Sequence, residues 1–251
     1  MSESMNFKQR KEIKYRLSKE QLAFFETKIA EHMEIDAYGL TSIASLYYDT
    51  PDYRLINRSI EKPFFKEKLR LRSYGLADED SRIYLEIKRK NAGIVYKRRA
   101  ASSEGEFADF IEGKASLGNS QIERELQAFL GKYGVLEPKY LIIYDRVAYF
   151  EKGGDLRVTI DRNPRYRNAD LDLHTSMEGT PLLEEGEAIL EVKAQGALPL
   201  WLSELLTEGK IYQTSFSKVG TAHILEMKKK PVFISSLIHS EQRRLGYGLS
   251  I

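Results

Sequence analysis

Charged and apolar side chains alternate along many short segments of this chain. In residues 68–72, three cationic side chains point to one face of an extended chain and two leucines point to the other. Similar alternation, rich in aromatic and β-branched residues and bounded by turn-forming ones, predicts further strands. The predicted strands cover residues 42–48, 65–74, 83–90, 94–101, 139–150, 156–161 and 188–194.

Helices are predicted between and after these strands. Ser18 followed by Gln21 is a capping-box pattern, so we expect a helix from Ser18 to about residue 34. Many strands with helices grouped between them favour an α+β fold, in which helices pack outside an antiparallel sheet or barrel. The other predicted helices cover residues 104–113, 119–133, 199–208 and 217–229, with a short one after the turn at residues 49–52.

Bulk composition removes several classes of function. The 39 Lys and Arg residues nearly balance 37 Asp and Glu residues, so no global positive field indicates nucleic-acid binding. The absence of cysteine excludes disulfides and thiolate metal sites. With a polar N-terminus and no run of 18 apolar residues, we expect a soluble, cytoplasmic protein without a transmembrane segment. We expect one domain over residues 1–230 and a C-terminal tail over residues 231–251.

The charges are sorted onto one face of several predicted strands. For a single strand, an ordinary solvated face explains the pattern, but five or six strands carry Lys, Arg and Glu almost exclusively. We therefore expect a closed barrel with a charged bore and apolar faces packed outward on helices. Buried cations are costly without partners, so the bore needs an elongated polyanion, and its carboxylates suit Mn²⁺ or Mg²⁺. The charged faces carry Lys14, Lys68, Arg70, Arg72, Lys88, Arg146, Arg157 and Lys193, with Glu12, Glu86 and Glu191.

Eight short motifs, taken in order, resemble those of one protein family. They are EIKY (12–15), SLYYDTP (45–51), KLRLRSY (68–74), LEIK (85–88), YDRVAY (144–149), RVTID (157–161), LEVK (190–193) and SFSK (215–218). Over residues 7–227 the chain resembles the catalytic domain of the vacuolar transporter chaperone (VTC) polyphosphate polymerases, within the triphosphate tunnel metalloenzyme superfamily. The resemblance implies a closed tunnel of eight antiparallel strands. Family members transfer the terminal phosphoryl group of ATP to polyphosphate with Mn²⁺ or a similar metal.

The resemblance also implies roles for individual residues. Glu191 would be the metal ligand, and Lys97 would contact the substrate, although the Lys-Arg run around Lys97 leaves its register open. The phosphoryl-transfer group would comprise Arg70, Arg72, Lys88, Arg146, Arg157 and Lys218. The other contacts to ATP, pyrophosphate or polyphosphate would come from Lys14, Lys68, Lys193, Glu12, Glu86 and Ser217.

Two departures bear on the function. Triphosphatases and related cyclases of the superfamily begin with Glu-x-Glu-x-Lys, whereas residues 10–14 here place Arg10 at the first Glu. This loss favours a polymerase, and a metal-dependent tunnel triphosphatase and a non-catalytic polyanion-binding protein are the alternatives. Eukaryotic members also carry a phosphate-sensing helical domain and a membrane segment that this sequence does not show. A membrane-protein partner and the oligomeric state therefore stay open.

Overall fold

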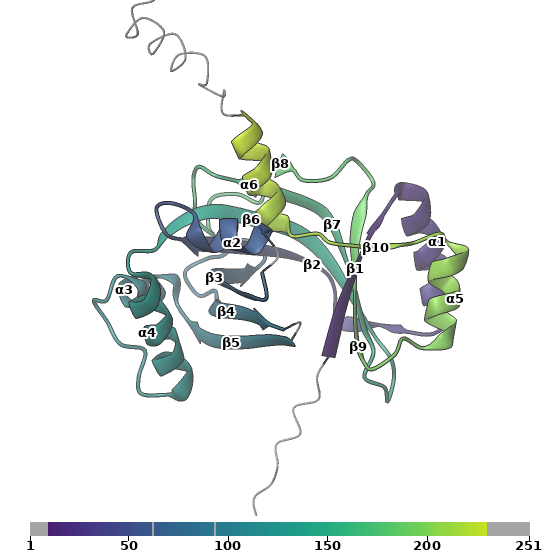
Figure 1. Ribbon diagram of the computed structural model, residues 1–251, viewed down its shortest axis with the longest axis horizontal. Helices are drawn as coiled ribbons and strands as arrows, with labels where there is room; N and C mark the ends of the chain where they lie inside the picture. Colours follow the sequence, from purple (N-terminus) through teal and green to yellow (C-terminus); the bar gives the residue numbers. More distant parts are fainter. Residues whose placement is uncertain (1–9, 62, 93, 230–251) are drawn as a thin grey trace, which may run out of the picture.

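Ten strands and six helices make up the part of the chain that the computed structural model describes, residues 10–61, 63–92 and 94–229 (Figure 1). The strands are β1 (Arg10–Leu17), β2 (Glu34–Asp49), β3 (Phe65–Tyr74), β4 (Ile83–Asn91), β5 (Ile94–Ser102), β6 (Glu137–Phe150), β7 (Arg157–Arg167), β8 (Thr180–Pro181), β9 (Ala188–Gln195) and β10 (Gln213–Thr214). The helices are α1 (Lys19–Ile29), α2 (Arg54–Ile60), α3 (Glu104–Ile111), α4 (Gln121–Tyr133), α5 (Leu200–Glu208) and α6 (Lys218–Lys229).

All the strands belong to one antiparallel sheet. Their order is β10-β1-β9-β7-β6-β2-β3-β4-β5, with β8 paired to β7 beside this path. The fold is therefore α+β and mostly antiparallel, as predicted, but the expectation of a closed sheet of eight strands is wrong. The short strand β10 pairs with β1 at Lys14 and Tyr15, so it takes part of the edge that closure onto β5 would need. Strands β8 and β10 are two residues each, too short for a recognisable sequence pattern.

The predicted strands and helices are confirmed, with shifted ends. Ser18 caps α1 through a complete capping box, as predicted, but the helix ends at Ile29 because strand β2 already begins at Glu34. The charged alternation at the start of the chain forms strand β1. The C-terminal tail predicted for residues 231–251 lies outside the described residues. No helix within the described ranges is long and apolar enough to cross a membrane.

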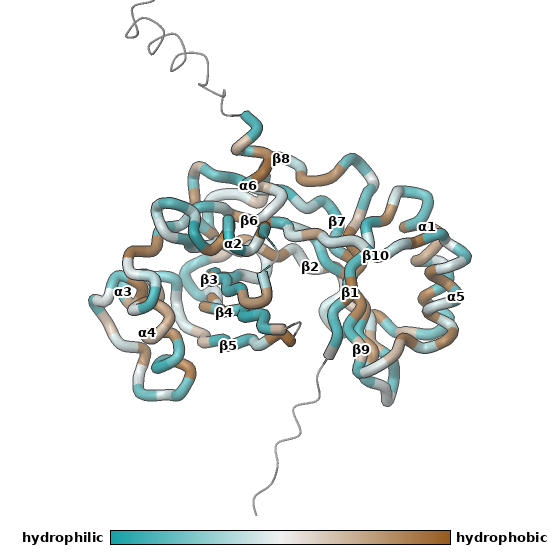
Figure 2. The backbone as a smooth tube through the Cα atoms, in the orientation of Figure 1, coloured by the Kyte–Doolittle hydropathy of each residue, from teal (hydrophilic) through white to brown (hydrophobic). Residues whose placement is uncertain are grey.

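The outer face of the sheet is apolar and covered by helices. Helices α1 and α5 cover one half, where Phe25 and Leu202 pack against Val158 and Ile160 of β7. Helices α3 and α4 cover the other half, where Phe107 and Phe129 belong to the same cluster as Leu69 and Leu71 of β3 (Figure 1). Because side chains alternate along a strand, this packing turns the cationic face of β3 inward. Hydrophobic and hydrophilic stretches accordingly alternate along the backbone (Figure 2).

The inner face of the sheet has a polar part and an apolar part. Helices α2 and α6 pack on the apolar part, where Val219 and Ala222 of α6 join Tyr140 and Ile142 of β6 in a buried cluster. The first residue of α6, Lys218, reaches from this end toward the polar part. The sequence did not indicate this arrangement, because the interior was expected to carry only charged residues.

Candidate functional site

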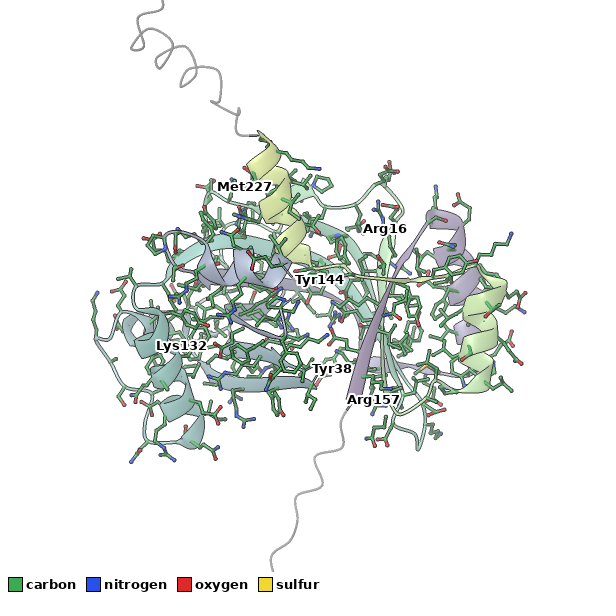
Figure 3. The ribbon with its side chains drawn as sticks, in the orientation of Figure 1. Arg16, Tyr38, Lys132, Tyr144, Arg157 and Met227 are labelled. Carbon is green, nitrogen blue, oxygen red and sulfur yellow. The ribbon has the colours of Figure 1, made fainter. Side chains whose placement is uncertain are left out.

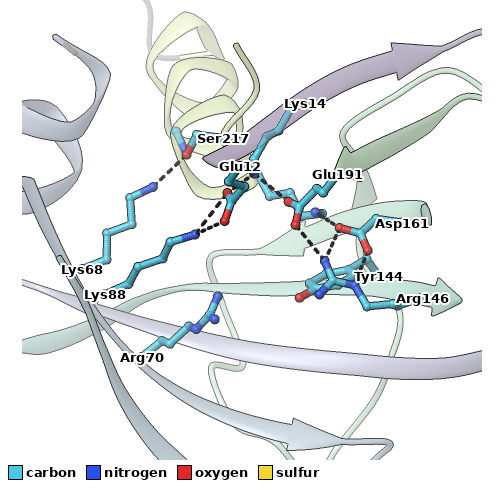
Figure 4. A network of polar contacts seen from close by, with 12 residues as sticks. Glu12, Lys14, Lys68, Arg70, Lys88, Tyr144, Arg146, Asp161, Glu191 and Ser217 are labelled. Carbon is cyan, nitrogen blue, oxygen red and sulfur yellow. Dashed lines mark hydrogen bonds and ion pairs between the residues drawn. The ribbon is translucent and has the colours of Figure 1, made fainter. Parts of the chain in front are cut away.

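The polar part of the inner face gathers cations from β1, β3, β4, β5, β6, β9 and α6. Figure 4 shows part of this network. On each strand the contributing residues are two apart, so regular extended backbone is enough to aim them inward. Four carboxylates lie among them: Glu12, Glu86, Asp161 and Glu191. The cations of this inner network are Lys14, Lys68, Arg70, Arg72, Lys88, Lys97, Arg99, Arg146, Lys193 and Lys218.

Asp161 forms the first carboxylate node and is fully buried. Arg146 Nε donates to Asp161 Oδ1 at 2.5 Å, and Arg146 NH2 donates to Oδ2 at 2.7 Å. Lys218 Nζ also donates to Oδ2. Burial by itself would raise the pKa of Asp161, but Lys218 and Arg146 outweigh it and lower the pKa below its usual value. Asp161 therefore stays ionised and holds Lys218 of α6 next to Arg146 of β6.

Glu191 forms a second node beside the first. Its Oε1 accepts from Lys14 Nζ at 2.6 Å, and its Oε2 accepts from Arg146 NH2 at 3.3 Å. Burial would raise the pKa of Glu191, yet Lys14, Lys218 and Arg146 hold it well below its usual value. The residue predicted as a metal ligand is thus an ionised, buried carboxylate that two cations engage.

Glu86 forms the third node, and four cations surround it. Arg70 NH2 lies 2.7 Å from Glu86 Oε2, and Lys97 Nζ lies 2.6 Å from Oε1. Arg99 NH2 is 2.5 Å from Oε1, whereas Arg72 Nε is farther, at 3.9 Å from Oε2. Burial would raise the pKa of Glu86, but Arg70, Arg72 and Lys97 hold it far below its usual value. One carboxylate cannot neutralise four cations, so this region keeps a positive surplus.

Two contacts join elements that are not neighbours in the sheet. Lys88 Nζ of β4 lies 3.1 Å from Glu12 Oε2 of β1, and Lys68 Nζ of β3 donates to Ser217 Oγ at 2.9 Å (Figure 4). These contacts show that the sheet curls until its two ends approach each other. Burial and the repulsion of Lys88, Lys14 and Lys66 lower the pKa of Lys68 to about 8, although Tyr47 opposes them.

Two tyrosines orient cations of the network. Tyr47 Oη accepts from Arg70 NH1 at 2.8 Å, and Tyr144 Oη accepts from Arg72 NH2 at 2.9 Å. Lys218 Nζ also lies 4.3 Å from the centroid of the Tyr144 ring, a cation–π contact. Burial would raise the pKa of Tyr47, but Arg70, Lys68 and Arg72 outweigh it and lower the pKa to about 7.

The structure brings together all but two of the predicted site residues through contacts between side chains. Arg157 is exposed and donates to its neighbour Leu156 O at 3.1 Å, and Figure 3 shows it away from Tyr144. Lys193 shares the inner face of β9 with Glu191, but within the described ranges its ammonium has no hydrogen bond or ion pair. Burial lowers the pKa of Lys193, and the opposing pull of Glu191 and Glu12 does not cancel this effect. Lys97 lies directly opposite Lys88 on the neighbouring strand, so the register of β5 places Lys97 on the inner face.

Four members of the site were not predicted. Asp161 stands four residues after Arg157 on a strand, so alternation alone could have placed it on the charged face. Arg99 is likewise two residues beyond Lys97. Tyr47 and Tyr144 could not be assigned in the same way, because no sequence signal separates a tyrosine that packs from one whose hydroxyl holds an arginine.

The carboxylates give no complete metal centre by themselves. Within the described ranges, no group of three or more His, Cys, Asp or Glu side chains is arranged to hold a metal ion. Glu12 and Glu191 are nevertheless close enough that each disfavours the other's charge, and both stay ionised. Such a pair suits Mg²⁺ or Mn²⁺, which is commonly held by one or two carboxylates together with phosphate oxygens.

The fold has relatives among solved structures. A protein from Bacillus halodurans, whose assignment as an adenylate cyclase is provisional, is 15% identical with a TM-score of 0.51, over 83% of this chain and 95% of its own. A similarly assigned protein from Vibrio parahaemolyticus is 14% identical with a TM-score of 0.46, over 86% of this chain and 98% of its own. At 15% identity, the similarity to the Bacillus halodurans protein shows a shared fold and no shared function. The similarity to the Vibrio parahaemolyticus protein is too weak to support a further conclusion. A search of curated proteins finds no match.

The family is shown by the sequence itself. The profile of the VTC domain matches residues 9–244, a span that contains every residue of the inner network. The resemblance seen in the short motifs is thereby confirmed over most of the chain. With its motifs, its curled antiparallel sheet and this profile in agreement, the chain belongs to the VTC domain family.

Proposed function

We propose that this protein is an ATP-dependent polyphosphate polymerase that transfers the terminal phosphoryl group of ATP to a polyphosphate chain. The observation that carries the proposal is the inner network, in which ten cations face four carboxylates on one continuous surface. Such a surplus needs a ligand with several negative charges in a row, because leaving buried cations unpaired costs several kcal/mol each, roughly. The functional unit would be a single domain over residues 1–230.

Arginine and lysine side chains would bind phosphates in different ways. The guanidinium groups of Arg70, Arg72 and Arg146 are held by hydrogen bonds, and their forks match phosphate oxygens in pairs. Lys68, on the same strand as Arg70 and Arg72, and Lys88 on the neighbouring strand β4 would add point charges beside them. A bound polyphosphate would replace Glu12 and Ser217 as the partner of these two lysines.

The proposed transfer needs no catalytic base. The acceptor is a phosphate oxygen that is already ionised near neutral pH, so the protein has only to align donor and acceptor and neutralise the equatorial oxygens. Lys218 and Arg146 meet at Asp161, where they could hold the transferring group between them. The inner face would also exclude water that otherwise competes as acceptor.

A divalent metal would be held by Glu191 and Glu12 together with phosphate oxygens. When bound, it would neutralise charge on the transferring phosphoryl group. Lys14 Nζ lies 2.6 Å from Glu191 Oε1 and 3.6 Å from Glu12 Oε1, so it occupies the space between these carboxylates. Lys14 would have to move toward a phosphate for the carboxylates to become ligands.

The test is incubation of purified protein with ATP and Mn²⁺, with analysis of the products. Long polyphosphate is the expected product. Stoichiometric free phosphate would support the metal-dependent tunnel triphosphatase instead, and binding without turnover would support the non-catalytic polyanion-binding protein.

Matched variants of β3 link the activity to the inner face. Arg70→Ala and Arg72→Ala should each abolish most turnover while the protein stays folded, because both side chains face inward. Lys132→Ala removes a cation on the outer side, where Lys132 Nζ lies 2.6 Å from Glu67 Oε2, and it should keep the activity. Near wild-type turnover of either arginine variant would contradict the proposal for that strand.

A further inference from the structure

An aromatic cluster continues the cationic face of β3 and β4 at the rim of the sheet. Tyr74 follows Arg72 on the same face of β3, and Tyr84 lies directly opposite Arg72 on β4. Residues two apart on a strand are separated by about 7 Å, so Tyr74 is one step beyond the arginine. Gly75, at a φ of 82°, then turns the chain away, which leaves Tyr74 at the end of the strand.

The ring of Tyr74 is fixed and accessible at once. Its hydroxyl accepts from Arg99 NH2 at 2.8 Å, and its ring meets that of Tyr84 edge-on, with centroids 5.7 Å apart at 83°. The Arg99 guanidinium in turn lies 4.1 Å from the centroid of the Tyr84 ring. Despite these contacts 47% of Tyr74 is exposed. An exposed aromatic ring held rigidly beside phosphate-binding cations loses little entropy when a flat ligand stacks on it.

We propose that Tyr74, supported by Tyr84 and Arg99, is a stacking platform for the nucleobase of the nucleotide donor. This inference rests on the proposed function, since it assigns the non-phosphate part of the donor to the same surface. The phosphates would run from Arg72 toward Arg70 and Lys68, and the base would lie at the rim, at the other end of β3 from Lys68 and its contact with Ser217. Stacking uses the face that every base possesses, so purine nucleotides of either kind should bind similarly.

The test compares ATP with ribose 5′-triphosphate, which has the same phosphates and ribose but no base. Wild-type protein should bind ATP about 5- to 150-fold more tightly, the range that base–aromatic stacking supplies. Tyr74→Leu should remove this preference without changing the affinity for ribose 5′-triphosphate, and Tyr74→Phe should retain it. Calorimetric titration measures all three, and unchanged ribose 5′-triphosphate binding shows that the Leu variant is folded.

Tyr96→Leu is the matched control. Tyr96 is an exposed tyrosine of β5, but it is an odd number of residues from Arg99 and therefore faces the other side of the sheet. This variant should keep the full preference for ATP. If the wild-type protein bound ATP and ribose 5′-triphosphate equally, the platform would be overturned, but the proposed function would stand. The same conclusion would follow if Tyr74→Leu still preferred ATP. If neither compound bound, the proposed function would fail and the platform with it.

Discussion

At the scale of single residues, the site is a set of ionised carboxylates that each hold more cations than they neutralise. Glu86 is the extreme case, since it is almost completely buried yet stays charged among four cations. Because the cations outnumber the carboxylates, the cations are held in position but their positive charge is not fully neutralised. Under the proposed function, a phosphate would bind with little rearrangement, because most of the side chains are already ordered.

Removal of the Glu86 charge should separate its structural role from its effect on binding. We expect Glu86→Gln to lower the free energy of unfolding by about 3 kcal/mol, because it leaves buried cations uncompensated. Tripolyphosphate should stabilise this variant more than the wild type, since it supplies the missing charge. Chemical denaturation with and without the ligand measures both effects. Glu187→Gln, at the half-exposed ion pair with Arg16, should cost less than about 1 kcal/mol.

Glu191 offers a different test, which concerns the metal. As a ligand it would supply anionic oxygen to Mn²⁺, so Glu191→Gln should abolish metal-dependent polyphosphate synthesis. Metal-free binding of tripolyphosphate should stay equal or become stronger, because a negative charge beside Lys14 and Arg146 is removed. Synthesis measured across a Mn²⁺ titration decides the matter. Turnover equal to wild type at every metal concentration would remove Glu191 from the site.

The titration of Lys68 predicts how binding depends on pH. Its pKa is lowered to about 8, so the charge that attracts phosphate is complete below that value and is lost as the pH rises through it. Phosphate groups have already lost their second proton near pH 6, approximately, so they do not mask the change. Affinity for tripolyphosphate should fall between pH 8 and 9, with a contribution of up to about tenfold from the proton that binding takes up on Lys68.

The control for this pH dependence is Lys68→Met. Its affinity should be lower at pH 7 and should fall less steeply than that of the wild type between pH 8 and 9, where Lys97, whose pKa burial also lowers to about 8, still loses its charge. A wild-type affinity that stays constant across the same range would contradict the role of Lys68.

At the scale of elements, helix α6 connects the apolar and polar parts of the inner face. His223 in the middle of α6 is buried, with Nδ1 3.0 Å from Tyr140 Oη and Nε2 3.0 Å from Asn57 Oδ1. Lys218 and Ser217 at the start of the helix meet the network. The position of α6 thus determines where two of the groups proposed to bind phosphate lie.

Loss of this anchor should act on the site from a distance. We expect His223→Phe to lower the free energy of unfolding by about 1–3 kcal/mol, since it leaves the Tyr140 hydroxyl and the Asn57 amide without their partner. It should also weaken tripolyphosphate binding, because Lys218 and Ser217 lose their fixed position. Thr27→Ala, at an exposed position of α1 on the outer side of the sheet, is the control for denaturation and calorimetry. Full affinity in His223→Phe would show that the other contacts of α6, which include the ion pair of Lys218 with Asp161, are enough to keep Lys218 and Ser217 in place.

At the scale of the whole molecule, the curled sheet brings its two ends together through charged side chains rather than through a closed ladder. A polyanion on the inner face would bridge both ends, so it should stabilise the entire fold. Tripolyphosphate at about 100 times its dissociation constant should add about 2.7 kcal/mol to the free energy of unfolding. Thermal unfolding measures this shift. Adenosine at the same concentration should give a much smaller one, and an equal shift would refute recognition centred on phosphate.

The sequence by itself determined the longer strands, the helices and the face on which most of the charges lie. Lys68, Arg70 and Arg72 could be assigned to one face because alternation along a strand is a local property of the backbone. Ser18 marked the start of α1 for a similar reason, since capping depends on neighbouring residues alone. The family motifs extended this to residues on separate elements, such as Lys218 and Glu191.

Only the tertiary structure decided how these faces combine. Closure of the sheet depends on whether distant edges pair, and the two residues of β10 at the edge of β1 leave no local signal. The roles of Tyr144 and Asp161 likewise depend on residues from other strands and from α6. Arg157 has the pattern of a site residue but lies in solvent, because alternation fixes a side chain's face and not its depth within the molecule.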